Sequence, residues 1–340
     1  MTNDAPPGAA RRGTAPGRRA LLAAATAAIA ASPSPHLHAQ EGGGTIRIVI
    51  PYPPGGGTDV LARPILPLLS ESLRQPVIVD NRGGAGGNLG AAQVARAAPD
   101  GLTLLMANNA QAINQYLYRD PGYDLARGFE PVSLVGTSPL IVVVPARSPA
   151  RSVADLVALA RRRPGALNYG SSGPGTPGHM AAVLFNGLAG MDVVHVPYQG
   201  SGPTTIALLA AQVDYSVTTP AAVEPHIRSG ALRALGVTSR ERFASFPDVP
   251  ALSETGIPAL ADFDLAIWWG LLAPAGTDAR ILDRLNAAVA AAVATPRLQE
   301  GWAAQGTIGR ANSRDAFRAL IGTELRRWER VVAENRITLD

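Results

Sequence analysis

Hydrophobic residues from position 46 onward fall alternately into short continuous runs and into stretches with helical spacing. In the first half of the chain, the runs predict strands at 46–50, 76–79, 102–106, 132–135 and 140–144. Helical spacing at 59–73, and in a stretch that ends near Ala97, separates the first three runs. Short strands joined through helices by few residues favour parallel βαβ units, so we expect an α/β fold.

A second series of the same kind begins at Ser152, a suitable helix N-cap. Its predicted strands are 167–170, 193–196, 213–217 and 232–237, and its predicted helices are 152–163, 179–188, 203–211 and 221–229. The proline- and glycine-rich segment 243–260 predicts an ordered loop with short helical turns. The apolar strand 266–273 is expected to return to the first series, before amphipathic helices at 278–294, 296–305 and 313–334.

The two series predict two lobes, between which the chain crosses twice. Pro145, at the end of the run 140–144, marks a plausible first crossing. We therefore expect one lobe to comprise residues 40–143 and 264–340, and the other to comprise residues 144–263. A chain of 340 residues is long enough to build two hydrophobic cores.

One glycine-rich stretch in each predicted lobe has the design of an anion-binding turn. Ile46–Asp59 leads from a β-branched strand through two prolines and three glycines to Thr58 or Asp59, either of which suits a helix N-cap. Leu167–His179 repeats this arrangement in the second series. Free backbone N–H groups and the helix dipole favour negative charge at such a turn. Two turns on two lobes could therefore close on one small anion.

Hydroxyl side chains accompany these glycines, at Thr58, Ser171, Ser172 and Thr176. Neutral donors can fix the orientation of a carboxylate without burying a permanent ion pair. The pattern therefore favours reversible capture of a carboxylate.

Residues 1–39 have the pattern of an export signal. Arg18 and Arg19 precede the short apolar run Ala20–Ala31, and a polar, proline-containing segment then leads to a cleavage site near Ala39. The apolar run is too short to span a bilayer. Paired arginines at 11–12 and 18–19 leave both the general secretory and the twin-arginine export routes open.

Composition removes several classes of function. All 30 residues counted as Lys+Arg are arginine, and the chain has no cysteine, which excludes lysine and thiol catalysis and zinc–thiolate sites. The net charge of +4 includes +3 from the leader (four arginines against Asp4), so the remainder carries +1 (4 − 3). Because no basic tract remains, we expect no nucleic-acid partner.

Motifs for nucleotide, metal and hydrolase sites are incomplete. The glycine run 83–90 has leucine at position 89, where G-x-G-x-x-G requires glycine, and the histidines after the leader have no metal-ligand spacing. We therefore expect no cofactor and no metal. Gly170–Gly173 lacks a glycine at position 174 for a nucleophile elbow around Ser172. An exported α/β hydrolase that uses Ser172 or Ser171, with His179 as the base, remains the alternative.

Several residues have both a structural and a functional interpretation. Asp59 is more typical of an N-cap than of a catalytic acid. His195 lies within an apolar strand and favours a structural role, whereas His179 could either cap a helix or line the site. Trp268 and Trp269 favour packing in a core or between the lobes, and the alternative is that one of them lines the cleft.

Ordered motifs from Ile46 to the C-terminus resemble one known family. They are IRIVIPYPPGGGTDVLARPI, DNRGGAGGNLGAAQVARAAPDGLTLL, LNYGSSGPGTPGH, VVHVPYQGSGP and LRALGVTSRERFASFPDVPALSETG. In this order they are similar to the substrate-binding receptors of tripartite tricarboxylate transporters, the Bug family. The resemblance implies a type II periplasmic binding protein fold, in which two lobes with mainly parallel sheets hold a small carboxylate in the cleft between them. It also implies a monomer in the periplasm, without enzymatic activity, that delivers its ligand to the membrane permease subunits.

The resemblance also implies which residues bind the ligand. By position they are Tyr52, Gly56, Thr58 and Asp59 from lobe one, Ser171, Ser172, Thr176 and His179 from lobe two, and Asn109, Tyr198 and Gly200 as additional walls. We also expect Thr218 to contact the ligand; the chain departs from the family at this position, where many relatives have an aspartate that can meet a ligand amino group. We therefore expect no amino-acid ligand. The sequence leaves open which carboxylate binds, and whether the receptor serves a permease or a sensory system.

Overall fold

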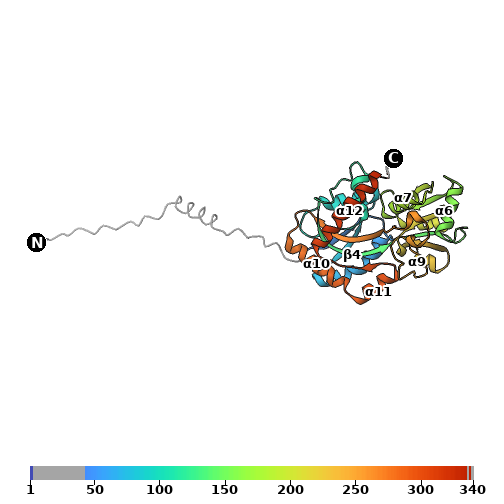
Figure 1. Cartoon of the computed structure of the whole chain (residues 1–340). Helices are drawn as coiled ribbons and strands as arrows, with labels where there is room; N and C mark the ends of the chain where they lie inside the picture. The colour runs from blue at the N-terminus through green and yellow to red at the C-terminus, as the bar shows by residue number, and fades with distance from the viewer. Residues whose placement is uncertain (3–42, 335–336, 338–340) are drawn as a thin grey trace. The chain divides into compact units, whose positions relative to one another are not determined.

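The computed structural model describes residues 1–2, 43–334 and 337. The predicted leader and its cleavage site near Ala39 lie outside the described residues, apart from positions 1 and 2. From Gly44 onward the chain forms two β-sheets flanked by helices. Figure 1 shows the first lobe around β4, α10, α11 and α12, and the second lobe around α6, α7 and α9.

The first lobe is built on a six-stranded sheet of order β11-β4-β10-β3-β1-β2. Its strands are β1 (Ile46–Ile50), β2 (Val77–Asn81), β3 (Thr103–Asn108), β4 (Phe129–Pro139), β10 (Ala266–Pro274) and β11 (Ile308–Gly309). Its α-helices are α2 (Gly57–Ala62), α3 (Leu66–Leu73), α4 (Asn88–Ala95), α5 (Asn109–Leu117), α10 (Ala279–Val293), α11 (Pro296–Ala304) and α12 (Arg314–Glu334). Strand β1 pairs in parallel with β2 and β3, whereas β10 runs antiparallel between β3 and β4.

The second lobe is built on a five-stranded sheet of order β7-β6-β8-β5-β9. Its strands are β5 (Ile141–Pro145), β6 (Asn168–Ser171), β7 (Val194–Pro197), β8 (Tyr215–Thr218) and β9 (Leu232–Val237). Its α-helices are α6 (Val153–Arg162), α7 (Pro177–Ala189), α8 (Ser201–Leu209) and α9 (Pro220–Arg228). The parallel pairs β6–β7 and β6–β8 place the carboxyl ends of these strands at one edge of the sheet.

The chain passes between the sheets beside Thr238, a completely buried residue. The Leu140 N–H donates to the Thr238 hydroxyl oxygen at 2.8 Å, and the Leu265 N–H donates to the Thr238 carbonyl at 2.8 Å. Both connections between the lobes are thus tied to one residue. The predicted boundary between residues 143 and 144 falls inside β5, all of which pairs within the second sheet, so the first crossing lies at Leu140.

Most predicted elements appear within a few residues of their expected bounds, and the α/β fold with two lobes is confirmed. Both sheets are mixed, however, and not mainly parallel as expected, because β10 and β5 run antiparallel to both of their neighbours. The helix predicted at 59–73 is divided into α2, the 3-10 turn η1 (Arg63–Ile65) and α3. Pro64 and Pro67 explain this division, because proline lacks the N–H that an uninterrupted helix would use. The run 132–135 extends into the eleven residues of β4. The other 3-10 turns are η2 (Ala85–Gly87), η3 (Leu252–Glu254) and η4 (Pro258–Leu260).

Helix α12 packs on the first sheet and on α5 around a buried carboxylate, Glu324. One of its oxygens accepts hydrogen bonds from Asn109 Nδ2 at 2.7 Å, Trp328 Nε1 at 3.1 Å and Trp268 Nε1 at 3.2 Å. Three donors on one oxygen satisfy a group that would otherwise be costly to bury. This cluster joins α5, β10 and α12.

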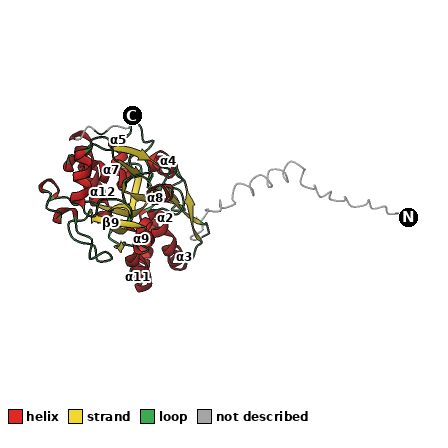
Figure 2. Ribbon diagram, turned by 90° about the vertical axis from the view of Figure 1, so that its right-hand side faces the viewer, coloured by secondary structure: helices red, strands yellow, loops and turns green. Residues whose placement is uncertain are grey.

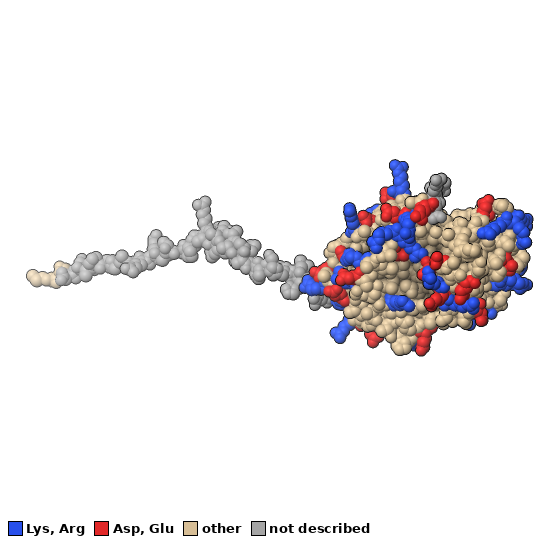
Figure 3. All heavy atoms as spheres, viewed as in Figure 1, with Lys and Arg blue, Asp and Glu red and all other residues tan. Residues whose placement is uncertain are grey.

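Arginine and acidic side chains lie interspersed over the face in Figure 3. Within the part of the chain that the structure describes, no helix combines the length and apolar character needed to cross a membrane.

We expect replacement of Glu324 by alanine to lower the free energy of unfolding by about 3 kcal/mol or more, because three buried N–H donors lose their acceptor. Urea unfolding followed by tryptophan fluorescence would measure the change. Glu324→Gln should cost less, since its carbonyl oxygen can still accept. The matched control is Glu329→Ala, on the exposed side of α12, which should stay within about 0.5 kcal/mol of the parent. Equal effects at positions 324 and 329 would contradict the role given to this cluster.

Candidate functional site

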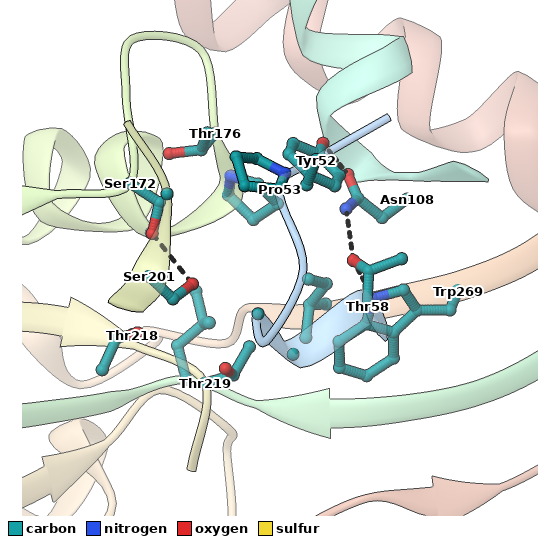
Figure 4. A pocket seen from close by; sticks show the side chains of 17 residues that line it. Tyr52, Pro53, Thr58, Asn108, Ser172, Thr176, Ser201, Thr218, Thr219 and Trp269 are labelled. Atoms are coloured by element: carbon teal, nitrogen blue, oxygen red, sulfur yellow. Dashed lines mark hydrogen bonds between the residues drawn. The ribbon is translucent and has the colours of Figure 1, made fainter. Parts of the chain in front are cut away.

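A cavity of about 60 Å³ lies between the two lobes and carries no charged side chain in its lining. Figure 4 shows Tyr52, Thr58, Asn108 and Trp269 of the first lobe facing Ser172, Thr176, Ser201 and Thr218 of the second. The lining residues are Tyr52, Pro53, Gly56, Gly57, Thr58, Asn108, Leu140, Ser172, Thr176, Pro177, Gly178, Gly200, Ser201, Thr218, Thr219, Ile267 and Trp269. We call this space the inner cavity. Since one water molecule needs roughly 10–15 Å³, it accommodates only a small ligand or the head of a larger one.

Five helices direct their N-termini at the inner cavity, because the N-cap residue of each one belongs to the lining. These are Gly56 of α2, Asn108 of α5, Thr176 of α7, Gly200 of α8 and Thr219 of α9. Figure 2 shows α2 of the first lobe close to α8 and α9 of the second, and α9 contacts both. The first N–H groups of a helix lack partners within it, and the N-terminus carries partial positive charge. The cavity is therefore suited to an anion although it contains no cationic side chain.

Threonine hydroxyls in the lining have protons available for a ligand. The Thr58 oxygen accepts from Trp269 Nε1 at 2.9 Å and, over a longer 3.5 Å, from Asn108 Nδ2. Both bonds use the hydroxyl as an acceptor, which leaves its own proton free to be donated. The Thr219 hydroxyl is buried and has no hydrogen-bond partner among the described residues. In a native structure such an unsatisfied buried group calls for an explanation, and a bound ligand provides one.

A serine pair adds a further donor on the side of the second lobe. The hydroxyls of Ser172 and Ser201 lie 3.1 Å apart and share one hydrogen bond, in which either oxygen can be the donor. One of the two protons is used in that bond, so the other remains available to the cavity. Thr176 differs, because its hydroxyl donates to the Gly173 carbonyl at 2.7 Å and thereby holds its own loop.

The first-lobe wall is held by Tyr52 and Asn108. The Tyr52 hydroxyl donates to Asn108 Oδ1 at 3.0 Å, and the same oxygen accepts from the Ala110 N–H and caps α5. Burial raises the pKa of the Tyr52 phenol, with hydrogen bonds to Asn108 and Gln111 opposing the shift. Tyr52 therefore stays neutral and adds no charge to the cavity.

The paired tryptophans of β10 have opposite roles, as strand alternation requires. Trp269 lines the inner cavity and hydrogen-bonds to Thr58. Trp268 lies in the core, edge-on to Phe317 at 5.5 Å between ring centroids. The prediction of packing in the core or between the lobes holds for Trp268, whereas Trp269 forms part of the cavity wall.

Seven of the twelve residues predicted to bind ligand are brought together in the lining: Tyr52, Gly56, Thr58, Ser172, Thr176, Gly200 and Thr218. Residues that sequence reasoning missed fall into two groups. The first group consists of sequence neighbours of predicted residues: Pro53, Gly57, Asn108, Pro177, Gly178, Ser201 and Thr219. The departure noted at Thr218 already pointed to the turn that contains Thr219. The second group, Leu140, Ile267 and Trp269, comes from the strand region where the chain crosses between lobes. The local sequence gives no signal for Leu140 and Ile267, whereas a tryptophan in the cleft was the less favoured alternative for the pair 268–269.

Asp59 and Asn109 lie outside the lining and have structural partners. The Asp59 carboxylate accepts from Arg63 Nε at 2.8 Å, from the Gly55 N–H at 3.0 Å and from Asn81 Nδ2 at 3.1 Å. Burial acts to raise the pKa of Asp59, but these hydrogen bonds outweigh it and hold the pKa below its ordinary value. The N-cap of α2 is Gly56, so the prediction of an N-cap at Thr58 or Asp59 was wrong; Asp59 lies in the first turn. Asn109 belongs to the Glu324 cluster, and its Oδ1 accepts from the Trp268 N–H at 2.9 Å.

Buried Ser171 and His179 form a cluster with the half-buried His195 behind the loop 171–176, outside the inner cavity. The Ser171 hydroxyl lies 2.6 Å from His195 Nε2, and His179 Nδ1 accepts from the Gly175 N–H at 3.2 Å. The two imidazole rings stack at 4.2 Å between centroids, and Tyr169 stacks on His195 at 4.8 Å. Both ends of the loop are thus anchored on the ring stack.

The Ser171–His195 pair has the contact that a hydrolase would require, but its setting does not suit one. Ser171 is only 2% exposed and does not line the cavity, so an ester carbonyl has no position from which it can be attacked. In the described part of the chain, neither imidazole has a carboxylate that hydrogen-bonds to it and orients it for catalysis. The base also differs from the expected one, because His179 bonds to the backbone. The pair is therefore a structural contact.

The last predicted residue, Tyr198, is also absent from the inner lining. It lies in a second, outer cavity next to the first, together with Gly84–Gly87 and residues 197–200. No group of three or more His, Cys, Asp or Glu residues in the described chain could hold a metal ion.

The fold and the site define a two-lobed solute-binding protein, the architecture of periplasmic binding proteins. A protein of Rhodopseudomonas palustris with adipate aligns with a TM-score of 0.83 and 34% identity, over 86% of this chain and 98% of the other. MatC of the same species, with bound malate, aligns with a TM-score of 0.80 and 32% identity, over 85% and 98% of the two chains.

The family follows from the sequence comparison. Residues 61–337 match the model of the tripartite tricarboxylate transporter family receptor. The protein BugT of Bordetella pertussis is 37% identical over 312 residues, which cover 91% of this chain and 94% of BugT. The chain therefore belongs to the tripartite tricarboxylate transporter receptor family, as its ordered motifs predicted.

The histidine stack predicts how stability depends on pH. Burial, aided by the neighbouring His195, lowers the pKa of His179 to about 3, and burial lowers the pKa of His195 to about 4. In the unfolded chain both should titrate near 6.5, so only the unfolded state gains these protons as the pH falls from about 6.5 towards 4. Stability should therefore fall over this range, by at most about 1.4 kcal/mol per pH unit for each histidine.

Urea unfolding at pH 7.0, 6.0 and 5.0 would measure this loss. In His179→Asn the loss should be smaller, because the amide oxygen can accept from Gly175 without titrating. The matched control is His226→Asn, in the last turn of α9 and outside the stack, which should keep the parent slope. A slope unchanged by His179→Asn would contradict the prediction.

Proposed function

We propose that this protein is a periplasmic receptor that captures a small carboxylate between its lobes and delivers it to the permease of a tripartite tricarboxylate transporter. The observation that carries the proposal is the convergence of five helix N-caps on a cavity without charged side chains. Partial positive charge and neutral donors can hold a carboxylate without an ion pair that would have to be broken on release. Family relatives with malate and adipate support the ligand class.

Both lobes contribute residues to the lining of the inner cavity. A ligand in this cavity would therefore be captured when the two lobes close on it. Thr58 donates from the first lobe, whereas Thr219 and the Ser172–Ser201 pair donate from the second. A ligand that bonds to both sides stabilises the arrangement in which they meet. Close contact is possible because residue 57 is glycine: a Cβ atom there would lie 2.7 Å from the Thr219 hydroxyl. We propose that the permease recognises this closed form.

The proposed receptor acts in the periplasm as a monomer, after removal of the leader near Ala39. Binding without chemical change fits the position of Ser171 and His195, which lie outside the cavity. A role in sensing instead of transport would use the same capture step. The two roles differ only in the partner of the closed form, permease subunits or a sensor.

Thr219→Val tests the binding site with little disturbance of the fold. Valine keeps the shape of threonine and removes a hydroxyl that has no partner among the described residues, so stability should be unchanged or slightly higher. The affinity for the best carboxylate should fall by about 1–2 kcal/mol, because the ligand loses a donor. A thermal-shift screen of mono-, di- and tricarboxylates would identify that ligand, and calorimetry would give both affinities.

The matched control is Thr205→Val, a buried threonine of α8 outside the lining, which should leave affinity unchanged. If Thr219→Val bound every carboxylate as tightly as the parent, the ligand would lie elsewhere. If the parent bound none of these acids and hydrolysed an ester instead, the receptor proposal would fall.

Discrimination against amino acids follows from the absence of a free carboxylate in the described lining. Asp59 is committed to Arg63 and Asn81, and Thr218 is neutral. An α-ammonium group would be buried in the cavity without a charged partner. Succinate and aspartate differ chiefly in this group, so succinate should bind at least about tenfold more tightly. Equal or tighter binding of aspartate in calorimetry would show that the site accepts amino acids.

A further inference from the structure

An outer chamber of about 310 Å³ adjoins the inner cavity and is about five times as large. The residues that line both spaces are Tyr52, Pro53, Ser172, Thr176 and Gly200. The other walls come from the loop 84–87 of the first lobe and from residues 197–199 of the second. Ala85, Pro197 and Gln199 are exposed, so the chamber opens to solvent, whereas most of the inner lining is buried. Any ligand too large for the inner cavity would extend into this space.

The described walls of the outer chamber are rich in ring-containing side chains and uncharged. Three tyrosines contribute to them, Tyr52, Tyr118 and Tyr198, and three prolines lie among them, Pro53, Pro174 and Pro197. No residue of the lining carries a charge at neutral pH. Aromatic rings stack favourably on other rings and bury large apolar areas. The chamber is thus better suited to an aromatic group than to a second charged group.

Helix N-termini are distributed unequally between the two spaces. Five N-caps face the inner cavity, whereas the outer chamber gains only Gly87, the N-cap of α4, in addition to the shared Thr176 and Gly200. Electrostatic attraction therefore places a carboxylate in the inner cavity and leaves the less polar end of the ligand outside it.

We propose that the outer chamber is a second subsite that binds the tail of the ligand, and that the preferred ligands are carboxylates with a flat, uncharged aromatic tail. This inference rests on the proposed function, because it assigns the carboxylate to the inner cavity. It adds the chemical class of the attached group, which the inner cavity alone leaves open.

Calorimetry with three acids tests the proposal on the purified protein. Propionate probes the inner cavity alone, 3-phenylpropionate adds an aromatic tail, and adipate adds a tail that ends in a second carboxylate. We expect 3-phenylpropionate to bind at least tenfold more tightly than propionate, and more tightly than adipate. Adipate as the tightest ligand of the three would overturn the assignment of an uncharged tail.

Two variants, one that enlarges the outer chamber and one that fills it, show whether a change in affinity comes from the tail subsite or from a general effect on folding. Tyr198→Ala removes an aromatic wall, and Gln199→Trp fills space from an exposed position of the loop. Each should abolish most of the advantage of 3-phenylpropionate over propionate. If both variants changed the affinities for the two acids by the same factor, or if the parent bound the two acids equally, the tail subsite would be refuted.

The variant Thr219→Val shows whether a negative result refutes only the tail subsite or also the proposed binding of a carboxylate in the inner cavity. It should weaken propionate and 3-phenylpropionate by similar factors, because both place a carboxylate in the inner cavity. A sensitivity to Thr219→Val without any preference for the aromatic tail would refute only the outer subsite. Absence of binding by all three acids, together with every other carboxylate of the thermal-shift screen, would refute both proposals.

Discussion

The arrangement of the two lobes depends on the buried hydrogen bonds of Thr238. Its backbone and hydroxyl groups bind Leu140, where the chain leaves the first sheet, and Leu265, where the chain returns to it. Both connections between the sheets pass Thr238. The hydrogen bonds of this residue to Leu140 and Leu265 therefore fix the position of one sheet relative to the other. Leu140 and Ile267, at the start and end of these crossings, are also part of the cavity wall. The inner cavity is thus built directly onto the connection between the lobes.

The suitability of the cavity for an anion comes from backbone geometry, because its described lining has no charged side chain. Each of the five helices begins where a strand or loop delivers its N-cap to the space between the lobes. Arginine is abundant in this chain, yet none of the arginines that the structure describes lines the inner cavity. A permanent cation would bind an anion more strongly but would also oppose its release. Helix termini and hydroxyl groups are a reasonable compromise for a receptor that must both hold and surrender its ligand.

Behind the cavity, polar clusters fix the segments that present the cavity-lining groups. The Glu324 cluster holds Asn109 at the start of α5, next to Asn108 in the lining. The stack of His179 and His195 holds the loop that carries Ser172 and Thr176. Asp59 holds the turn before α2 through Gly55 and Asn81. Residues whose side chains could serve in catalysis or binding thus act here as supports, each one or a few positions along the chain from a residue that lines the cavity.

Local sequence determined which segments form strands, helices and glycine turns, because hydrophobic period, proline and glycine act over a few residues. It also identified both turns that meet at the site, and its ordered motifs identified the family. The sequence did not reveal which side chain of each turn faces the cavity: Ser172 does and Ser171 does not, and Asn108 does and Asn109 does not. That choice depends on partners distant in sequence, such as His195 for Ser171 and Glu324 for Asn109. Only the tertiary structure brings those partners into contact, and only it places Trp269 beside Thr58 across 211 positions of the chain.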